Sequence, residues 1–267
     1  MVLFKNRVRS LIEKRIMKRL ISIMIRNLHH IPYGWFKLRL YAGHPDKYSA
    51  NQRHALMREF AKWMVDGGRI TLKTYGTEYI PQGNGFMIFS NHQGLFDGFA
   101  IAHALETPFS TVYKKELDKV PFVKHIFSCV KAIALDRDDV RQGLEVINRV
   151  ANEVKEGRNF LIFPEGTRSK NGNQLSDFKS GCLKSATKAK CPILPVVLFD
   201  SYKAFDTNSN ERITVQVHFL KPLYYEDYKD MKAVQIADTI KGFIEKTIEN
   251  NTSRTTGDYL QNRAAVF

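Results

Sequence analysis

The feature that most constrains the fold is a series of short apolar runs that alternate with helical patterns between residues 70 and 220. The runs are rich in β-branched and aromatic residues, which is typical of strands buried inside a sheet. Predicted strands occupy 86–90, 109–113, 132–136, 159–163, 193–199 and 213–219, with helices near 98–105, 118–129, 138–156 and 179–189. The sequence therefore predicts an α/β fold, in which a single layered domain has a mostly buried mixed sheet flanked by helices.

The boundaries of this domain follow from the segments on either side of it. The chain has 267 residues, which suits one large domain with a small helical appendage. A helix is predicted over 51–66, and a last helix from about Met231 to Ile248. We therefore divide the chain into an N-terminal segment, a linker, the α/β domain and a polar tail, at 1–43, 44–50, 51–250 and 251–267.

The N-terminal segment combines apolar and basic side chains at helical spacing. Apolar residues recur every three or four positions from Val8 to Leu28, with basic residues between them and Glu13 as the single acid. Residues 31–41 add aromatic and basic side chains, a mixture typical of membrane interfaces. This pattern predicts an amphipathic two-helix segment that docks on an anionic membrane. Helices that pack on the domain and expose their charges to water would show the same pattern.

Charge and cysteine content narrow the class of protein. Lys and Arg number 41 against 27 Asp and Glu, and this net charge of +14 indicates an anionic partner. No helix-turn-helix, zinc-finger or RNA-binding signature accompanies the charge, which argues against nucleic acid. The three cysteines form no C-x-x-C pair, so we expect a reducing cytosolic setting without disulfides or a metal site. Neither a signal peptide nor an uncharged stretch long enough to span a bilayer is predicted.

The segment SNHQGLFDG, residues 90–98, holds the first candidate for chemistry. His92 and Asp97 would diverge by roughly 140° on a regular helix, so they can meet only if His92 precedes the helix. Their place between a strand and a helix allows this, and glycines at 94 and 98 favour an irregular turn. A histidine oriented by a carboxylate is suited to act as a general base. His54 and Glu59 share the spacing but lie within a helical pattern, where the side chains point apart.

A second candidate is FPEGTRS, residues 163–169, which directly follows the predicted strand 159–163. Gly166 allows a ligand to approach the backbone, and Arg168 offers a planar fork of donors. Such an arrangement at a strand end suits an anion. A turn with an exposed salt bridge would have the same residues.

The motifs taken together resemble those of the glycerolipid acyltransferase family, of the lysophosphatidic acid acyltransferase type. NHQGLFD at 91–97 is similar to the family's N-H-x-x-x-x-D, and FPEGTRS matches its third motif in full. KKEL at 114–117, with DR at 136–137, resembles the intermediate motif, and CPILPVVL at 191–198 resembles the fourth. The resemblance covers about residues 85–200, and four motifs in order are far more specific than one.

The resemblance implies an O-acyltransferase of phospholipid biosynthesis. Such an enzyme transfers a fatty acyl group from acyl-CoA or acyl-carrier protein to the free hydroxyl of lysophosphatidic acid, which gives phosphatidic acid. It implies His92 as general base, Asp97 as the residue that orients it, and substrate-binding roles for Lys115, Arg137, Glu165, Gly166 and Arg168. Backbone N–H groups near Gly94 or Gly166 are candidates for the oxyanion hole. No metal or cofactor is implied, because the thioester carrier is a co-substrate.

The same resemblance implies a place and partners for the protein. It would lie at the cytoplasmic face of the cell membrane as a peripheral or monotopic protein, where its lysophospholipid acceptor resides. Other acceptors remain alternatives, namely lyso-ornithine lipid, lysophosphatidylglycerol and glycerol 3-phosphate. A catalytically silent lipid-binding protein is a further alternative, against which the intact His92 and Asp97 argue.

Overall fold

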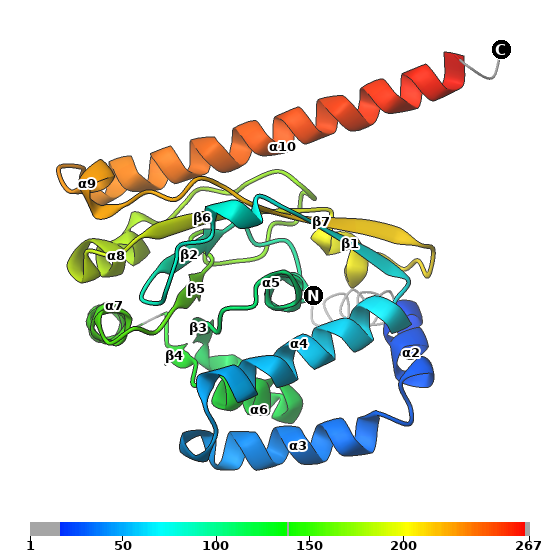
Figure 1. Cartoon of the computed structure of the whole chain (residues 1–267), viewed down its shortest axis with the longest axis horizontal. Helices are drawn as coiled ribbons and strands as arrows, with labels where there is room; N and C mark the ends of the chain where they lie inside the picture. The colour runs from blue at the N-terminus through cyan, green and yellow to red at the C-terminus, as the bar shows by residue number, and fades with distance from the viewer. Residues whose placement is uncertain (1–16, 138, 265–267) are drawn as a thin grey trace, which may run out of the picture.

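A seven-stranded sheet with the order β1-β7-β6-β2-β5-β3-β4 forms the centre of the molecule (Figure 1). The computed structural model describes residues 17–137 and 139–264. All paired strands run parallel except β6 and β7, which are antiparallel. The strands are β1 (Ile70–Tyr75), β2 (Met87–Ser90), β3 (Ser110–Lys114), β4 (Ile133–Leu135), β5 (Phe160–Ile162), β6 (Ile193–Phe199) and β7 (Ile213–Phe219). The predicted α/β fold with a mixed, buried sheet is confirmed.

Successive side chains along a strand point to opposite faces of the sheet, so the strands contribute to two hydrophobic cores. Met87 and Phe89 of β2 face one core, and Ile88 between them faces the other. The first core is closed by α7 (Val140–Lys155), α8 (Leu183–Ala189) and α10 (Ala233–Ala264). The second is closed mainly by α5 (Asp97–Ala104) and by Ile23 of α2 (Met17–Arg26). Both faces of the sheet are therefore covered, as its continuous apolar strands require.

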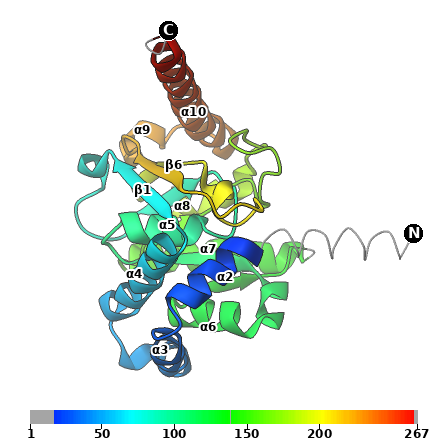
Figure 2. The same cartoon turned by 90° about the vertical axis from the view of Figure 1, so that its right-hand side faces the viewer.

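A third layer of helices lies against α5, on the side of the sheet opposite α10 (Figures 1 and 2). It consists of α3 (Ile31–Gly43), α4 (Ala50–Gly67) and α6 (Pro121–Cys129), which share a small apolar core around Leu38 and Leu56. Ser49 caps α4 through a reciprocal capping box with Gln52. The linker predicted at 44–50 contains a short 3-10 helix, η1 (Pro45–Lys47).

Two elements differ from the sequence prediction. Strand β1 was not predicted, because it lies at the sheet edge and only alternate residues such as Ile70 are buried. The last helix, α10, does not end near residue 248 but continues to Ala264 through most of the predicted polar tail. No proline interrupts 249–264, and Gly257 costs a helix only about 1 kcal/mol, so a helix that packing has already started can continue through these residues.

The predicted N-terminal segment is described from residue 17 onward, and its first sixteen residues lie outside the described part. Within the described part it forms two helices, α2 and α3, as expected. No helix in residues 17–137 and 139–264 is long and apolar enough to cross a membrane.

His218 on β7 should make folding sensitive to acid. Its ring stacks on Tyr75, and burial lowers its pKa to about 4. Since the unfolded chain binds the proton more readily, stability is complete above about pH 6.5 and falls as the pH drops towards 4. Between pH 7 and pH 5 we expect the free energy of unfolding of the native protein to fall by about 1 kcal/mol more than that of His218→Gln, after allowance for partial exposure. Urea unfolding at the two pH values measures this; equal losses would show that another group is responsible.

Candidate active site

The predicted motifs meet at one edge of the sheet. Because β6, β2, β5, β3 and β4 run parallel, the segments that follow them leave from the same edge. His92 follows β2, FPEGTRS follows β5, Lys115 follows β3 and Arg137 follows β4. The carboxyl edge of a parallel sheet is where ligands bind in open α/β folds. Motifs far apart in the sequence therefore form a single site.

His92 and Asp97 are in direct contact. His92 lies in the irregular turn after β2, and α5 begins at Asp97, so the five-residue spacing does not separate them. Nδ1 of His92 lies 2.7 Å from Oδ2 of Asp97. Asp97 is fully buried, whereas the side chain of His92 is 24% exposed. With Nδ1 held by the carboxylate, Nε2 is the nitrogen left to exchange a proton with a substrate.

The Asp97 carboxylate accepts hydrogen bonds from other groups besides the imidazole of His92. Its Oδ2 also accepts from the backbone N–H of Gln93, at 2.5 Å, and of Gly94, at 2.9 Å. Its Oδ1 accepts from the hydroxyl of Ser201 at 2.6 Å. Hydrogen bonds to a carboxylate favour its charged form and fix its orientation. The buried carboxylate is thus held in one orientation, with Oδ2 facing His92.

The turn between His92 and Asp97 leaves little room for a side chain at position 94. A Cβ there would lie 2.7 Å from Oδ2 of Asp206 and 3.4 Å from Cα of Tyr202. Gly98, the other glycine of the motif, has open space where its Cβ would be. The close approach of the segment after β6 therefore explains Gly94, and Gly98 is not needed for the turn.

Glu165 of FPEGTRS anchors the backbone of His92. Its Oε1 accepts from His92 N–H at 2.7 Å, and its Oε2 accepts from Ser176 N–H at 2.9 Å. The residue is 3% exposed, and burial raises its pKa while the two N–H groups oppose that rise. The resemblance implied that Glu165 helps to form the acceptor pocket; its carboxylate instead lies buried beside the His92 backbone, where it ties two loops together.

Phe163, the first residue of FPEGTRS, supports the imidazole from one side. The two rings stack with centroids 4.1 Å apart and planes 18° from parallel. Ser169 N–H, at the end of the motif, donates to the His92 carbonyl at 2.7 Å. The motif therefore wraps around His92. Phe163 was not predicted as a site residue, although its place at the head of the motif was the available signal.

Gly166 occupies the tight turn of this loop. Its φ of 71° lies in the left-handed region, and its N–H donates to the Phe163 carbonyl at 3.0 Å. The N–H of Gly94 is taken by Asp97. The N–H groups of Gly94 and Gly166 themselves are thus both engaged within the protein, and the prediction of an oxyanion hole from N–H groups near them stays a prediction. The side chain of Lys179 lies close by, with Nζ 3.3 Å from where a Cβ of residue 166 would be.

Arg168 is the cation of FPEGTRS that faces solvent. Its side chain is 46% exposed, and its Nη1 lies 3.7 Å from Oδ1 of Asp206. Asp206 is partly buried, and this burial raises its pKa although Arg168 opposes the rise. The long, loose ion pair leaves the guanidinium free to exchange Asp206 for another anion.

Lys115 and Arg137 lie further along the same edge. Lys115 is exposed and begins the 3-10 helix η3 (Lys115–Lys119), and Arg137 is exposed in the turn after β4. In register, Lys114 of β3 pairs with Leu135 of β4, so KKEL and DR are neighbours. Since strands are about 4.8 Å apart, the two segments leave the sheet roughly 10 and 15 Å from β2. Both cations can therefore contact a long substrate at a distance from His92.

The chain is similar to known proteins in both sequence and fold. The family model described as Acyltransferase matches residues 71–199. The 1-acyl-sn-glycerol-3-phosphate acyltransferase of Salmonella typhimurium is 30% identical over 167 residues, which cover 62% of this chain and 67% of the relative. The chain belongs to this acyltransferase family. The same-named protein of Escherichia coli is 29% identical over 64% of this chain and 70% of its own.

The relative from Borreliella burgdorferi, also named 1-acyl-sn-glycerol-3-phosphate acyltransferase, is 30% identical over 61% of this chain. The chain spans about two thirds of the length of such relatives, 66% in this case. Among solved structures, the acyltransferase PlsC from Thermotoga maritima superposes with a TM-score of 0.64 over 86% of this chain and 98% of PlsC. At 23% identity, that likeness shows the fold.

The family model ends at residue 199, but the site of this acyltransferase chain does not. Ser201 contacts Asp97, and Asp206 contacts Arg168. Both belong to the segment that follows β6, the strand beside β2, and that segment therefore leaves from the same edge of the sheet. Neither residue was predicted from the sequence.

The cysteines of the acyltransferase chain are poorly suited to carry an acyl group. All three are free, and burial raises the pKa of Cys129 to about 11 and that of Cys182 and Cys191 to about 12. A thiol with so high a pKa is protonated and weakly nucleophilic near neutral pH. In the described part of the chain, no three His, Cys, Asp or Glu side chains are grouped so that they could hold a metal ion.

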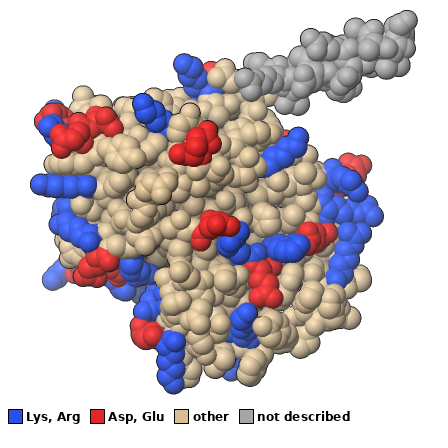
Figure 3. Space-filling view, in the orientation of Figure 1, with Lys and Arg blue, Asp and Glu red and all other residues tan. Residues whose placement is uncertain are grey.

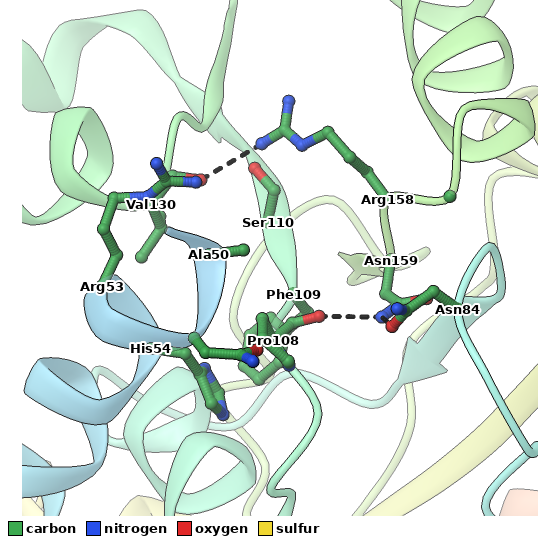
Figure 4. Close-up of a pocket in the computed structure, with 12 residues that line it drawn as sticks. Ala50, Arg53, His54, Asn84, Pro108, Phe109, Ser110, Val130, Arg158 and Asn159 are labelled. Atoms are coloured by element: carbon green, nitrogen blue, oxygen red, sulfur yellow. Dashed lines mark hydrogen bonds between the residues drawn. The ribbon is translucent and has the colours of Figure 1, made fainter. Parts of the chain in front are cut away.

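A pocket at the opposite edge of the sheet is lined by His54, the histidine of the second His–acid pair considered above (Figure 4). Its polar side chains mostly bind the backbone: His54 Nε2 lies 2.8 Å from the Leu105 carbonyl, and Asn159 donates to the Pro108 carbonyl at 2.8 Å. Glu59 points elsewhere and pairs with Lys37. The prediction that His54 and Glu59 point apart is confirmed. The pocket lies between α4 and the starts of β3 and β5, where these hydrogen bonds hold the helix against the sheet.

Proposed function

We propose that this chain transfers a fatty acyl group from a thioester, carried by coenzyme A or an acyl-carrier protein, to the free hydroxyl of lysophosphatidic acid. The observation that supports this best is the contact between His92 and Asp97 at the edge where FPEGTRS lies. The family, and the relatives named 1-acyl-sn-glycerol-3-phosphate acyltransferases, support lysophosphatidic acid as the acceptor. The product is phosphatidic acid.

In the reaction we propose, His92 acts as a general base. Nε2 takes the proton of the acceptor hydroxyl as that oxygen attacks the thioester carbonyl carbon. The Asp97 carboxylate stabilises the imidazolium that forms. When the tetrahedral intermediate collapses, the carbon–sulfur bond breaks, and the imidazolium returns its proton to the departing sulfur. The substrate supplies the nucleophile, so no residue of the chain is acylated.

Acyl transfer in mixed micelles tests this function directly. Labelled acyl-CoA and labelled acyl-carrier protein are offered separately, with lysophosphatidic acid as acceptor, and labelled phosphatidic acid is the expected product. If a product forms only with lysophosphatidylglycerol, lyso-ornithine lipid or glycerol 3-phosphate, the proposed acyl transfer is correct and the proposed acceptor is wrong. If neither donor gives a product with any of these acceptors, the chain is not an acyltransferase of this class.

Arg168 is proposed to bind the acceptor phosphate in exchange for Asp206. A bidentate contact between arginine and phosphate typically contributes enough to change affinity about 10- to 100-fold. We expect Arg168→Ala to raise KM for lysophosphatidic acid by that factor and to have little effect on a neutral monoacylglycerol acceptor. Steady-state kinetics with both acceptors measures the difference.

Arg141→Ala is the matched control for Arg168, because Arg141 also makes an ion pair of 3.7 Å, with Glu145 on α7. KM should be unchanged in that variant. An equal rise of KM for the neutral and the phosphate-bearing acceptor in Arg168→Ala would contradict a role in phosphate binding.

Helices α2 and α3 are proposed to dock on the membrane that holds the acceptor. Large apolar side chains on them and in the turn between them are exposed, notably Ile25 of α2 and Leu28 of the turn at 68% each, and Phe36 of α3 at 67%. On the face shown in Figure 3, basic and acidic side chains are interspersed, so charge alone singles out no docking surface there. Exposed apolar side chains beside basic ones suit the headgroup layer.

Sedimentation with anionic vesicles tests this docking. Ile25→Asp combined with Leu28→Asp should weaken binding by at least about 10-fold, since each apolar side chain contributes on the order of 1–2 kcal/mol when it leaves water. Leu144→Asp is the control, because Leu144 is 53% exposed on α7, away from these helices. Binding that is equal in all three proteins would rule out docking through α2.

A further inference from the structure

Ser201 is a fully buried residue beside the catalytic carboxylate. It begins the 3-10 helix η5 (Ser201–Ala204), directly after β6, and has no exposed surface. Its hydroxyl lies 2.6 Å from Oδ1 of Asp97, 104 residues earlier in the chain. A hydroxyl with no access to water donates to the acceptor that the protein supplies, which here is Asp97.

The backbone around Ser201 is fixed by its own hydrogen bonds. Asp200 has a left-handed φ of 63°, which turns the chain out of β6. Ser201 N–H donates to Oε1 of Gln93 at 2.8 Å, and the Gln93 amide donates to Asn173 at 2.8 Å. Asn173 in turn accepts from Asp200 N–H at 2.8 Å. Gln93, the residue after His92, therefore also fixes the backbone of Ser201, which keeps the Ser201 hydroxyl within hydrogen-bond distance of the Asp97 carboxylate.

The two oxygens of Asp97 are held differently. Oδ2 accepts from the imidazole and from two backbone N–H groups, whereas Oδ1 accepts from the hydroxyl of Ser201. Without that donor, Oδ1 would be a buried charged oxygen left unsatisfied. The carboxylate could then rotate about its last bond, and Oδ2 would leave the plane of the imidazole.

We propose that Ser201 is a positioning residue of the active site, which fixes the Asp97 carboxylate so that Oδ2 faces Nδ1 of His92. This proposal rests on the proposed acyl transfer. Ser201 touches no substrate; it acts through Asp97. Its loss should therefore lower kcat by about 10-fold and leave KM within about twofold.

Three substitutions of Ser201 distinguish the effect of losing the hydroxyl from the effect of changing the size of the side chain. Ser201→Ala removes the donor, Ser201→Cys keeps the size with a weak donor, and Ser201→Thr keeps the hydroxyl. We expect kcat to fall about 10-fold in the first two and to recover to within about threefold of the native protein in the third. If Ser201→Ala does not fold, Ser201→Cys gives the same comparison.

Ser185→Ala is the matched control. Ser185 lies on α8, is 3% exposed and donates at 2.6 Å to the Cys182 carbonyl, and it has no hydrogen bond to Asp97 or His92. Its loss should lower the melting temperature without a change in kcat. A similar loss of kcat in Ser185→Ala and Ser201→Ala would mean that both act only through stability.

A second comparison uses Asp97→Ala as background. If Ser201 acts through Asp97, Ser201→Ala adds less than about a twofold loss of kcat once the carboxylate is gone. A further 10-fold loss in that background would overturn the proposal, because it would show an effect independent of Asp97.

The downfield proton NMR signal of His92 Hδ1, identified by its absence in His92→Ala, gives a readout that needs no substrate. We expect Ser201→Ala to shift or broaden this signal and Ser185→Ala to leave it unchanged. If the native chain transfers no acyl group but Ser201→Ala shifts the signal, the proposed function fails and the positioning role stands. If acyl transfer proceeds normally and the signal is the same in Ser201→Ala, the positioning role is overturned.

Discussion

Replacement of His92 by alanine is expected to lower kcat for acyl transfer on the order of 10³-fold. In the proposed reaction His92 is the base that takes the proton of the acceptor hydroxyl, and general base catalysis contributes about 10²- to 10⁴-fold. Alanine leaves Asp97 in place, but a fully buried carboxylate cannot reach a substrate on the exposed side of the imidazole. Acyl transfer to lysophosphatidic acid, followed with purified protein at saturating substrate, measures the effect.

His54→Ala is the comparison that makes this result specific. His54 is buried and also has an acid five positions later, but its Nε2 binds the Leu105 carbonyl. Its loss leaves a buried carbonyl without a partner, so the melting temperature should fall while kcat stays within about twofold. If His92→Ala retains more than a tenth of native kcat, the base is another group and the proposed mechanism is wrong.

The contact between His92 and Asp97 could be predicted because its determinants are local. The apolar run before His92 and the helical pattern after Asp97 place both in one strand–turn–helix unit, and that unit brings the side chains within 2.7 Å. Buried parallel strands also appear as continuous apolar runs, so the inner strands were predicted. The half-buried edge strand β1, Ile70–Tyr75, gave a weaker pattern and was missed.

Residues whose role depends on tertiary contacts could not be assigned. The sequence places Glu165 at a strand end, but only the fold shows that its carboxylate points inward to His92 N–H and Ser176 N–H. Ser201 and Asp206 belong to a segment that becomes part of the site because β6 lies beside β2. No spacing or periodicity reports which strands become neighbours across more than a hundred residues. The membrane docking of residues 1–43 stays a prediction, as do the roles of Lys115 and Arg137.

Asp97→Asn is expected to lower kcat by about 10³- to 10⁴-fold with little loss of stability. The asparagine oxygen can accept from the imidazole and the backbone N–H groups that now bind Oδ2. Its amide can donate to the hydroxyl of Ser201, which accepts as readily as it donates. The geometry therefore survives, but the negative charge that stabilises the imidazolium is gone, and the loss falls on the transition state.

Asp97→Ala distinguishes the loss of the charge from the loss of the hydrogen bonds. It removes the acceptor for the imidazole, the two backbone N–H groups and the Ser201 hydroxyl. Its melting temperature should fall well below that of Asp97→Asn, because each buried donor left unpaired costs about 1–3 kcal/mol. Asp66→Asn is the control for charge alone: Asp66 is exposed on α4 and paired with Lys62, and its change should alter neither quantity. If Asp97→Asn keeps kcat within 10-fold of the native value, orientation of His92 suffices, and the charge of the carboxylate is not what drives proton transfer.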